Sequence, residues 1–335
     1  MRNKNDAPRA TLPGQRVLSV TEDAYLSKVF FIRGSSNFLF GVVPLALLLF
    51  ACELPVEKNL KKGELSALVS EPYAVLLQQQ AEEFHRLYRE TKVVIAATTT
   101  REAIVRMLND TVRVICIERQ FNEEERAAFQ AAEVGTVETK IAEDALAVLV
   151  SQQNPMRNAS LATLKDIVSG AKTSWSEVPE SKWSGPIELV LTGRNSGTYE
   201  LLTRHFLKLA NEPTPAHVAE TSRGVLEYVD SHPQALGIVS SAALQDSLPN
   251  IRVLSLEAAD SIAAGRPFVM LHQANIHRGF YPWHFPVYMY RLQEFTGIAL
   301  GFTAFVASAP GQKMLLEAKL VPATMPVRIV QLKEN

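Results

Sequence analysis

The chain has 335 residues, of which 47% are hydrophobic, and this is enough for two domains of ordinary size. Charged residues make up 21% of the chain and the formal net charge is −1. A broadly basic surface of the kind that binds nucleic acid is therefore not expected.

A short apolar stretch, Phe38–Cys52, lies near the N-terminus and follows a basic flank. It is about as long as the hydrophobic region of a signal peptide and short for a membrane span. Its last residues, Leu49-Phe50-Ala51-Cys52, resemble a bacterial lipobox, in which the cysteine is lipidated. We therefore expect residues 1–52 to be an N-terminal extension with a lipoprotein signal peptide, and Cys52 to carry the lipid. A membrane anchor or a buried helix that ends in cysteine is the alternative.

After a polar tether, residues 53–63, apolar runs and amphipathic stretches alternate. They predict, in chain order, strand 65–69, helix 72–88, strand 93–96, helix 101–108, strand 112–117, helix 122–133, strands 145–150 and 187–191, helices 198–210 and 223–232, strands 236–240 and 281–290, and helices 295–307 and 311–318. Repeated strand–helix units favour an α/β fold with mainly parallel sheets covered on both faces.

The turn before the helix at 198–210 says most about function. Arg194 supplies a two-pronged cation, and Gly197 lets an anion approach the backbone. Ser196 and Thr198 add hydroxyl donors. A helix start also leaves N–H groups unpaired and carries partial positive charge. Together these features describe a pocket for a small tetrahedral oxyanion. An ordinary capped helix start with a surface arginine is the alternative.

Several segments, in the same order, resemble the phosphate-binding proteins of phosphate ABC transporters. The turn at Arg194 is similar to their Arg-x-x-Ser-Gly-Thr anion loop, and Arg113–Glu125 to their strand, Glu-Arg turn and acidic helix start. Further matching blocks are Asn154-Pro155 with Leu161–Val178, Val225–Ser240, Tyr281–Tyr288 and Pro310–Lys313. The resemblance covers residues 64–332.

The resemblance implies an α/β, two-lobed periplasmic-binding-protein fold of type II, in which each lobe is a mainly parallel sheet with helices on both faces. Two hinge crossovers would divide the chain, so that residues 64–147 with 280–335 form lobe 1 and residues 148–279 form lobe 2. The ligand would lie in the cleft, where strand ends and helix N-termini converge.

The resemblance also implies that two other strand-to-helix turns reach the ligand. One contains Ser70-Glu71 and the other Thr99-Thr100. Plain helix capping is the alternative for the first, and one threonine of the second is expected to touch the ligand. The expected ligand-binding set is Ser70, Glu71, Thr99, Thr100, Glu118, Arg119, Arg194, Ser196, Gly197 and Thr198.

Two departures from the family pattern concern the identity of the ligand. The family loop is often longer and richer in glycine, whereas only Asn195 separates Arg194 from Ser196 here. Many members also carry an Asp after the third strand, which can accept the proton of hydrogen phosphate and repel sulfate. Glu118 and Arg119 stand at this turn. They are candidates for that acceptor and for a second cation, or else they form surface charges or an ion pair.

No catalytic or metal motif is found. Ser196 comes one position late for a Gly-x-Ser-x-Gly nucleophile elbow, and neither a phosphate-loop lysine motif nor Gly-x-Gly-x-x-Gly occurs. The histidines are scattered, and the two cysteines, Cys52 and Cys116, give no metal spacing and no disulfide framework. We therefore expect no enzymatic activity, no cofactor and no metal.

The sequence thus predicts a solute-binding lipoprotein that captures inorganic phosphate between its lobes and delivers it to an ABC permease. We expect a monomer, held by its lipid on a bacterial membrane and facing the periplasm or the cell exterior, without a nucleic-acid partner. A phosphate-sensing or scaffold lipoprotein on the same fold is the alternative. An enzyme acting on phosphate esters is a less favoured one.

Overall fold

The structure is a computed structural model that describes residues 59–246 and 248–324. All of these belong to one compact unit, Pro55–Asn335. The other unit, Met1–Leu54, contains the expected signal peptide and Cys52 and lies outside the described residues. Among the helices that the structure describes, none combines the length and the apolar character needed to cross a membrane.

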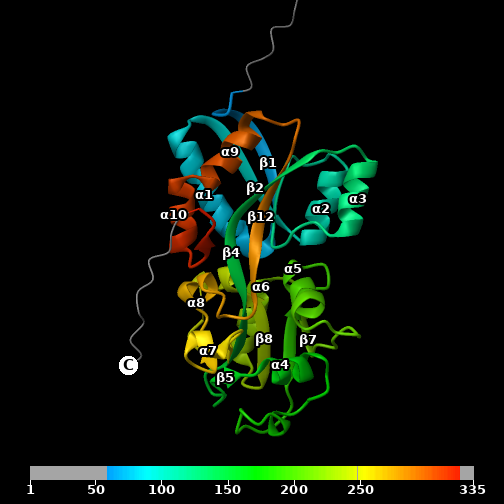
Figure 1. The fold of residues 1–335 in the computed structure, drawn as a ribbon, viewed down its shortest axis with the longest axis vertical. Coiled ribbons are helices and arrows are strands. Elements are labelled where there is room, and N and C mark those ends of the chain that lie inside the picture. The colour runs from blue at the N-terminus through cyan, green and yellow to red at the C-terminus, as the bar shows by residue number, and fades with distance from the viewer. Residues whose placement is uncertain (1–58, 247, 325–335) are drawn as a thin grey trace, which may run out of the picture. The chain divides into compact units, whose positions relative to one another are not determined.

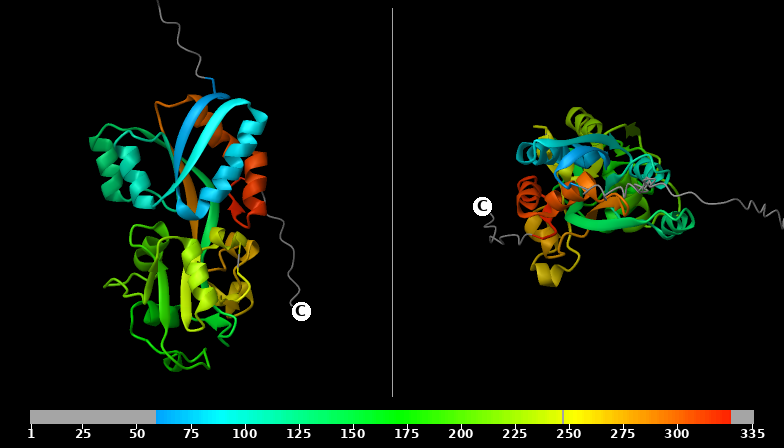
Figure 2. Two further views of the ribbon diagram at one scale, coloured as in Figure 1. Left: turned by 180° about the vertical axis from the view of Figure 1, so that it is seen from behind. Right: turned by 90° about the horizontal axis from the view of Figure 1, so that it is seen from above.

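The first lobe is built from strand–helix units whose strands pair in parallel. The strands are β1 (Lys62–Ser70), β2 (Glu90–Thr98) and β3 (Val114–Ile117). The helices are a 3₁₀ turn (Glu71–Tyr73), α1 (Ala74–Leu87), α2 (Thr100–Leu108), α3 (Glu123–Ala131), α9 (Gly297–Ala307) and α10 (Ala309–Glu317). Helices α1, α9 and α10 pack together on one side, and α2 and α3 lie on the other (Figure 1, Figure 2).

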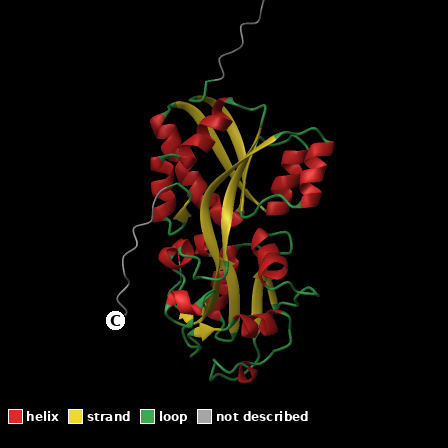
Figure 3. Cartoon of the chain, viewed as in Figure 1, coloured by secondary structure: helices red, strands yellow, loops and turns green. Residues whose placement is uncertain are grey.

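Two antiparallel strands, β4 (Thr136–Ser151) and β12 (His284–Leu292), link the lobes (Figure 3). β4 changes its partner midway. Up to Ala145 it pairs with β12, and from Leu146 it pairs with β8 (Ala235–Ser240). Residues Ala145 to Val150 are fully buried, which explains why this part of β4 is an uninterrupted apolar run.

The second lobe repeats the strand–helix plan. Its strands are β5 (Asn158–Ala159), β6 (Glu188–Thr192), β7 (His217–Ala219), β8, β9 (Ile251–Val253), β10 (Ser255–Glu257) and β11 (Phe268–Val269). Its helices are α4 (Leu161–Val168), 3₁₀ turns at Trp175–Glu177 and Ser241–Asp246, α5 (Gly197–Glu200), α6 (Ser222–Ser231), α7 (Ser261–Ala264) and α8 (Gln273–His277). Strands β6, β7 and β8 pair in parallel.

One ten-stranded sheet runs through both lobes in the order β2-β1-β3-β12-β4-β8-β6-β7, and β9 and β13 (Val321–Pro322) pair with β4. Parallel pairing holds within the strand–helix units, as expected. The antiparallel pairs of this sheet all involve β4 or β12, the strands that connect the lobes. The sheet is therefore more mixed than the strand–helix alternation predicts.

The helix predicted at residues 198–210 is wrong in form and length. After α5, residues Leu201–Phe206 form a π-helix, and the helical segment ends there. The Thr203 hydroxyl donates to the carbonyl of Tyr199, so this side chain competes for a carbonyl that an ordinary α-helix uses internally. Short π-helical segments are rare and often occur at functional sites.

Candidate functional site

The candidate site lies where the carboxyl ends of neighbouring parallel strands meet. Ser70 ends β1, Glu118 follows β3, and Thr100 opens the helix after β2. Because β2, β1 and β3 are adjacent and parallel, these three residues come to one edge of the sheet although they are far apart in sequence. The structure thus brings together three members of the expected ligand-binding set.

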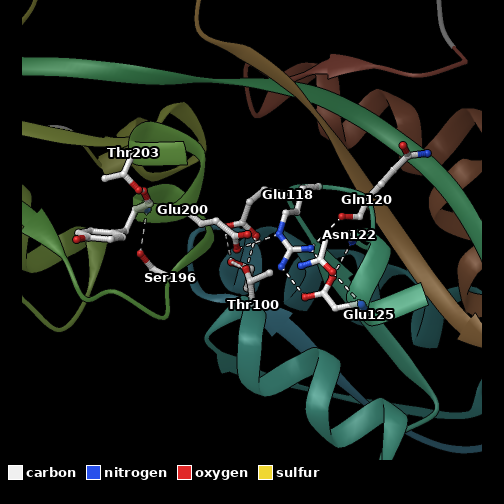
Figure 4. Close-up of polar contacts among 11 residues, drawn as sticks. Thr100, Glu118, Gln120, Asn122, Glu125, Ser196, Glu200 and Thr203 are labelled. Atoms are coloured by element: carbon white, nitrogen blue, oxygen red, sulfur yellow. Dashed lines mark hydrogen bonds and ion pairs between the residues drawn. The ribbon is translucent and has the colours of Figure 1, made fainter. Parts of the chain in front are cut away.

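The Glu118 carboxylate is the centre of this cluster. The Ser70 hydroxyl donates to Glu118 Oε1 at 3.0 Å, and the Thr100 hydroxyl donates to Oε2 at 2.7 Å (Figure 4). The Glu118 residue is 2% exposed, so the alternative that it is a surface charge is wrong. Burial raises the pKa of Glu118, and the bonds from Thr100 and Ser70 oppose that shift.

Gly197, at the start of α5 in the second lobe, lies against the same carboxylate. A Cβ atom at this position would come within 2.1 Å of Glu118 Cδ and Oε1, so no larger residue fits while Glu118 keeps its place. Glu118 therefore touches both lobes at once. Its surroundings are two hydroxyls on one side and a helix start on the other.

Other residues at the start of α5 are hydrogen-bonded or buried. Ser196 caps α5 by accepting a hydrogen bond from the Tyr199 N–H at 3.2 Å, and its hydroxyl also lies 2.6 Å from that of Thr192. Thr198 is buried. The Tyr199 hydroxyl is buried and has no hydrogen-bond partner among the described residues.

Arg119 forms ion pairs with residues of both lobes. It donates to both oxygens of Glu125, at 2.7 and 2.8 Å, and to Glu200 of α5 at 3.0 Å (Figure 4). The ion-pair alternative for Arg119 is therefore what this structure shows. The pair with Glu200 joins the first lobe to the second.

Arg194 is not among the groups that surround Glu118. Its side chain is 71% exposed and pairs with Glu212 at 2.6 Å. It lines a polar cleft of about 440 Å³, to which Arg119, Tyr199 and Glu200 also contribute. Ser70, Thr100, Glu118 and Gly197 do not line this cleft, and the present partner of Arg194 is a solvent-exposed carboxylate.

Thr99 caps a helix, whereas neither Ser70 nor Glu71 caps the 3₁₀ turn after β1, and Glu71 instead contacts the start of α6, whose cap is Thr221. Glu71 accepts hydrogen bonds from the Ser222 N–H at 3.1 Å and from the Ser222 hydroxyl at 2.6 Å, at the start of α6. Because Ser222 belongs to the second lobe, this hydrogen bonding is a contact between lobes. Thr99 accepts from the Glu102 N–H at 3.3 Å and caps α2.

Sequence reasoning missed Asp144, a fully buried carboxylate in β4. It accepts hydrogen bonds from the Tyr73 hydroxyl at 2.9 Å, from the hydroxyls of Ser240 and Ser241, and from the Ala145 N–H. The signal available in the sequence was an aspartate directly before the apolar run 145–150. A carboxylate buried at such a place needs hydrogen-bond donors from elsewhere in the fold. It connects the 3₁₀ turn after β1 with the end of β8.

No metal or reactive-thiol site is visible in the described part of the chain. No group of three or more His, Cys, Asp or Glu residues there could hold a metal ion. Cys116 is a free, buried cysteine, and burial raises the pKa of its thiol. A thiol of this kind is a poor nucleophile and fills space in the core.

A family model described as the PBP superfamily domain matches residues 56–310. The chain therefore belongs to the PBP superfamily. The phosphate-binding protein PstS of Pseudomonas aeruginosa is 23% identical over 289 residues, which cover 81% of this chain and 87% of that protein. Protein SphX of Synechococcus elongatus is 23% identical over 215 residues, 63% of this chain. The chain spans 62% of the length of SphX, less than two thirds.

Solved structures share the fold. A protein from Clostridium perfringens, assigned as a phosphate ABC transporter substrate-binding protein and solved with bound phosphate, superposes with a TM-score of 0.68 at 20% identity, over 78% of this chain and 100% of that one. An ABC-type phosphate transport receptor from Vibrio cholerae gives a TM-score of 0.60 at 20% identity, with the same coverage. The family model confirms that the chain is a PBP-like protein, and the solved structures confirm the predicted two-lobed α/β fold.

Proposed function

We propose that this chain is a solute-binding protein that captures inorganic phosphate in the cleft between its lobes. The central observation is that two hydroxyls and a helix start converge on one buried oxyanion, the Glu118 carboxylate. Donors that satisfy a carboxylate can also satisfy phosphate, because both present negatively charged acceptor oxygens. The phosphate-binding relatives and the phosphate held in the Clostridium structure support this choice of ligand.

In the proposed complex, Glu118 moves aside and phosphate takes its donors. Ser70, Thr100 and Thr198 supply hydroxyls, and the start of α5 supplies backbone N–H groups. The displaced carboxylate remains a neighbour of the ligand and accepts the proton of hydrogen phosphate. Sulfate has no such proton at neutral pH, so two negative charges would meet, and phosphate is preferred.

Arg194 is the proposed cation of the site. An exposed ion pair such as Arg194–Glu212 contributes only about 0–1 kcal/mol, so exchanging Glu212 for a doubly charged ligand in the cleft costs little. Tyr199 lines the same cleft, and its hydroxyl, which is buried and unpartnered in this structure, is a further proposed donor for the ligand.

The proposal extends to the role of the protein in transport and to its location. Delivery to an ABC permease, a lipid anchor at Cys52 and a position outside the cytoplasm fit the relatives named as phosphate-binding and transport proteins. Residues 64–147 with 280–335 and residues 148–279 are the proposed lobes, since β4 changes its partner between Ala145 and Leu146. The protein would act as a monomer without catalysing a reaction.

The test is calorimetric titration of the purified chain with phosphate, sulfate and a phosphate monoester. We expect saturable binding of phosphate and weaker binding of the other two. A chain that binds the ester or sulfate more tightly than phosphate would contradict the proposed ligand. A chain that binds none of the three would contradict the function.

A further inference from the structure

A side chain of the protein itself, Glu118, takes the hydroxyl donors that are proposed for phosphate. Glu118 is 2% exposed, and its two carboxylate oxygens take the hydroxyl hydrogens of Ser70 and Thr100. On the other side, the carboxylate lies so close to Gly197 that even a methyl group would not fit between them. Phosphate cannot reach these donors until Glu118 leaves.

Contacts between residues of the two lobes lie beside this cluster. Besides the contact of Glu118 with Gly197, Arg119 pairs with Glu200 at 3.0 Å, and Glu71 accepts from the Ser222 hydroxyl at 2.6 Å. Each of these contacts connects a residue of the first lobe with one of the second. Of the three groups in the first lobe, only Glu118 also takes the donors that the site offers to a ligand.

We infer that Glu118 is an internal substitute for the ligand, whose carboxylate occupies the phosphate position, holds the unliganded lobes together and competes with phosphate for Ser70 and Thr100. This role rests on the proposed function, because it defines the position in which phosphate binds.

Competition of this kind lowers the affinity of the protein. A ligand that binds only a minor, open population has an apparent affinity reduced by that fraction, so an open fraction of about 1% weakens binding about 100-fold. The competing carboxylate is part of the same chain, so its effective concentration is high whatever the concentration of protein. The protein would therefore respond only at phosphate levels well above those that a vacant pocket would detect.

The length of the side chain is what allows Glu118 to reach Gly197. An aspartate at this position would keep the charge but would withdraw the carboxylate by one carbon–carbon bond, about 1.5 Å. Aspartate is also the residue that the family often carries after this strand. Glu118→Asp therefore separates the effect of reach from the effect of charge.

The first measurement is the distance between the lobes. Spin labels at cysteines substituted for Gln130 and Lys165, both exposed and in different lobes, report it by pulsed electron paramagnetic resonance when Cys52 is replaced by serine. We expect a single short distance without ligand that phosphate leaves unchanged. In Glu118→Ala the distance should lengthen or become broad, and saturating phosphate should restore it. An unliganded parent protein that is open, or a variant that stays closed, would overturn the inference.

The second measurement is the phosphate affinity by calorimetry. Glu118→Asp, which keeps the proton acceptor but withdraws it from Gly197, should bind phosphate at least about tenfold more tightly than the unmodified chain. Glu123→Ala removes the same charge from an exposed position on α3 and should leave the affinity unchanged. Binding of phosphate by Glu118→Asp that is no tighter than by the unmodified chain would mean that the carboxylate does not compete with the ligand, which overturns the inference and leaves the proposed function intact.

The two measurements distinguish a failure of the proposed function from a failure of the inference. If neither the unmodified chain nor its variants bind phosphate, the proposed function is wrong. The distance measured without ligand then still decides whether Glu118 holds the lobes together, because that measurement requires no phosphate.

Discussion

Two carboxylates among the described residues, those of Glu118 and Asp144, are buried. Each is ionisable, almost without solvent contact, and surrounded by hydroxyl donors. A carboxylate in such a place is tolerated only when its oxygens accept hydrogen bonds, because desolvation otherwise favours its neutral form. Their environments differ, since Asp144 has four donors within the fold, whereas the donors of Glu118 are those proposed for phosphate.

Removing the guanidinium of Arg194 tests the proposed cation at the residue scale. Arg194→Ala should weaken phosphate binding by about 1.5–3 kcal/mol, the usual value for a hydrogen bond to a charged group, or one to two orders of magnitude. The melting temperature should hardly change, because the pair with Glu212 is exposed.

Calorimetry and thermal unfolding of the same preparation measure both effects. Arg106→Ala is a matched control, since Arg106 belongs to an exposed pair with Glu102 and does not line the cleft. An unchanged phosphate affinity in Arg194→Ala would remove Arg194 from the site.

Burial gives Glu118 a predictable influence on stability. Its pKa in the folded protein is raised above the usual 4.5. The folded state therefore keeps this proton to higher pH than the unfolded chain, and a stabilising contribution present below about pH 4.5 is lost as the pH rises through the folded-state pKa. In Glu118→Gln, which cannot titrate, this contribution is absent. The unfolding free energy of the unmodified chain minus that of Glu118→Gln should fall as the pH rises from about 4 to about 8.

Urea unfolding at several pH values measures this difference, and Glu123→Gln provides the comparison from an exposed site. A difference that grows with pH would show that the folded state favours the charged form of Glu118.

At the scale of an element, the start of α5 depends on a glycine because another side chain takes its space. Gly193 and Gly197 lie in the same turn, but only Gly197 would bring a Cβ within 4 Å of another residue. The requirement is therefore steric contact with Glu118 rather than backbone conformation. Local sequence cannot distinguish these two glycines, because the clashing group belongs to the other lobe.

Gly197→Ala should lower the free energy of unfolding by about 1–3 kcal/mol, as overpacking does, or drive the lobes apart. Gly193→Ala, the matched control, should change it by less than about 1 kcal/mol. Denaturant unfolding of both variants gives the comparison. Combining Gly197→Ala with Glu118→Ala should recover most of the loss, because the clash then disappears. Additive effects of the two substitutions would contradict the contact.

At the scale of the whole molecule, β4 and β12 join the strands of the two lobes into one sheet. Asp144 lies where β4 passes from one lobe to the other. Asp144 binds Tyr73 from the first lobe and Ser240 and Ser241 from the second. It therefore fixes the relation between the lobes from inside the sheet, whereas Glu71, Glu118 and Arg119 act across the cleft.

Asp144→Ala should lower the free energy of unfolding by about 3 kcal/mol, because buried hydroxyls lose their acceptor. Asp166→Ala, which removes an aspartate that is 44% exposed, should cost less than about 1 kcal/mol. Urea unfolding measures both. Equal losses in the two variants would mean that Asp144 contributes no more than a surface charge.

The sequence by itself determined the order of most strands and helices, the superfamily and the turns that carry the candidate site residues. These features are local, since hydrophobic periodicity, capping residues and turn chemistry act over a few positions. Thr99 and Ser196 illustrate this, because each caps the helix that begins beside it. Only the tertiary structure decided which side chains meet. Ser70 and Glu118 are 48 positions apart, and Arg119 and Glu200 are 81 apart. Their contacts depend on how β1, β3 and α5 pack, and this packing placed Glu118 among buried hydroxyls and left Arg194 in an exposed ion pair with Glu212.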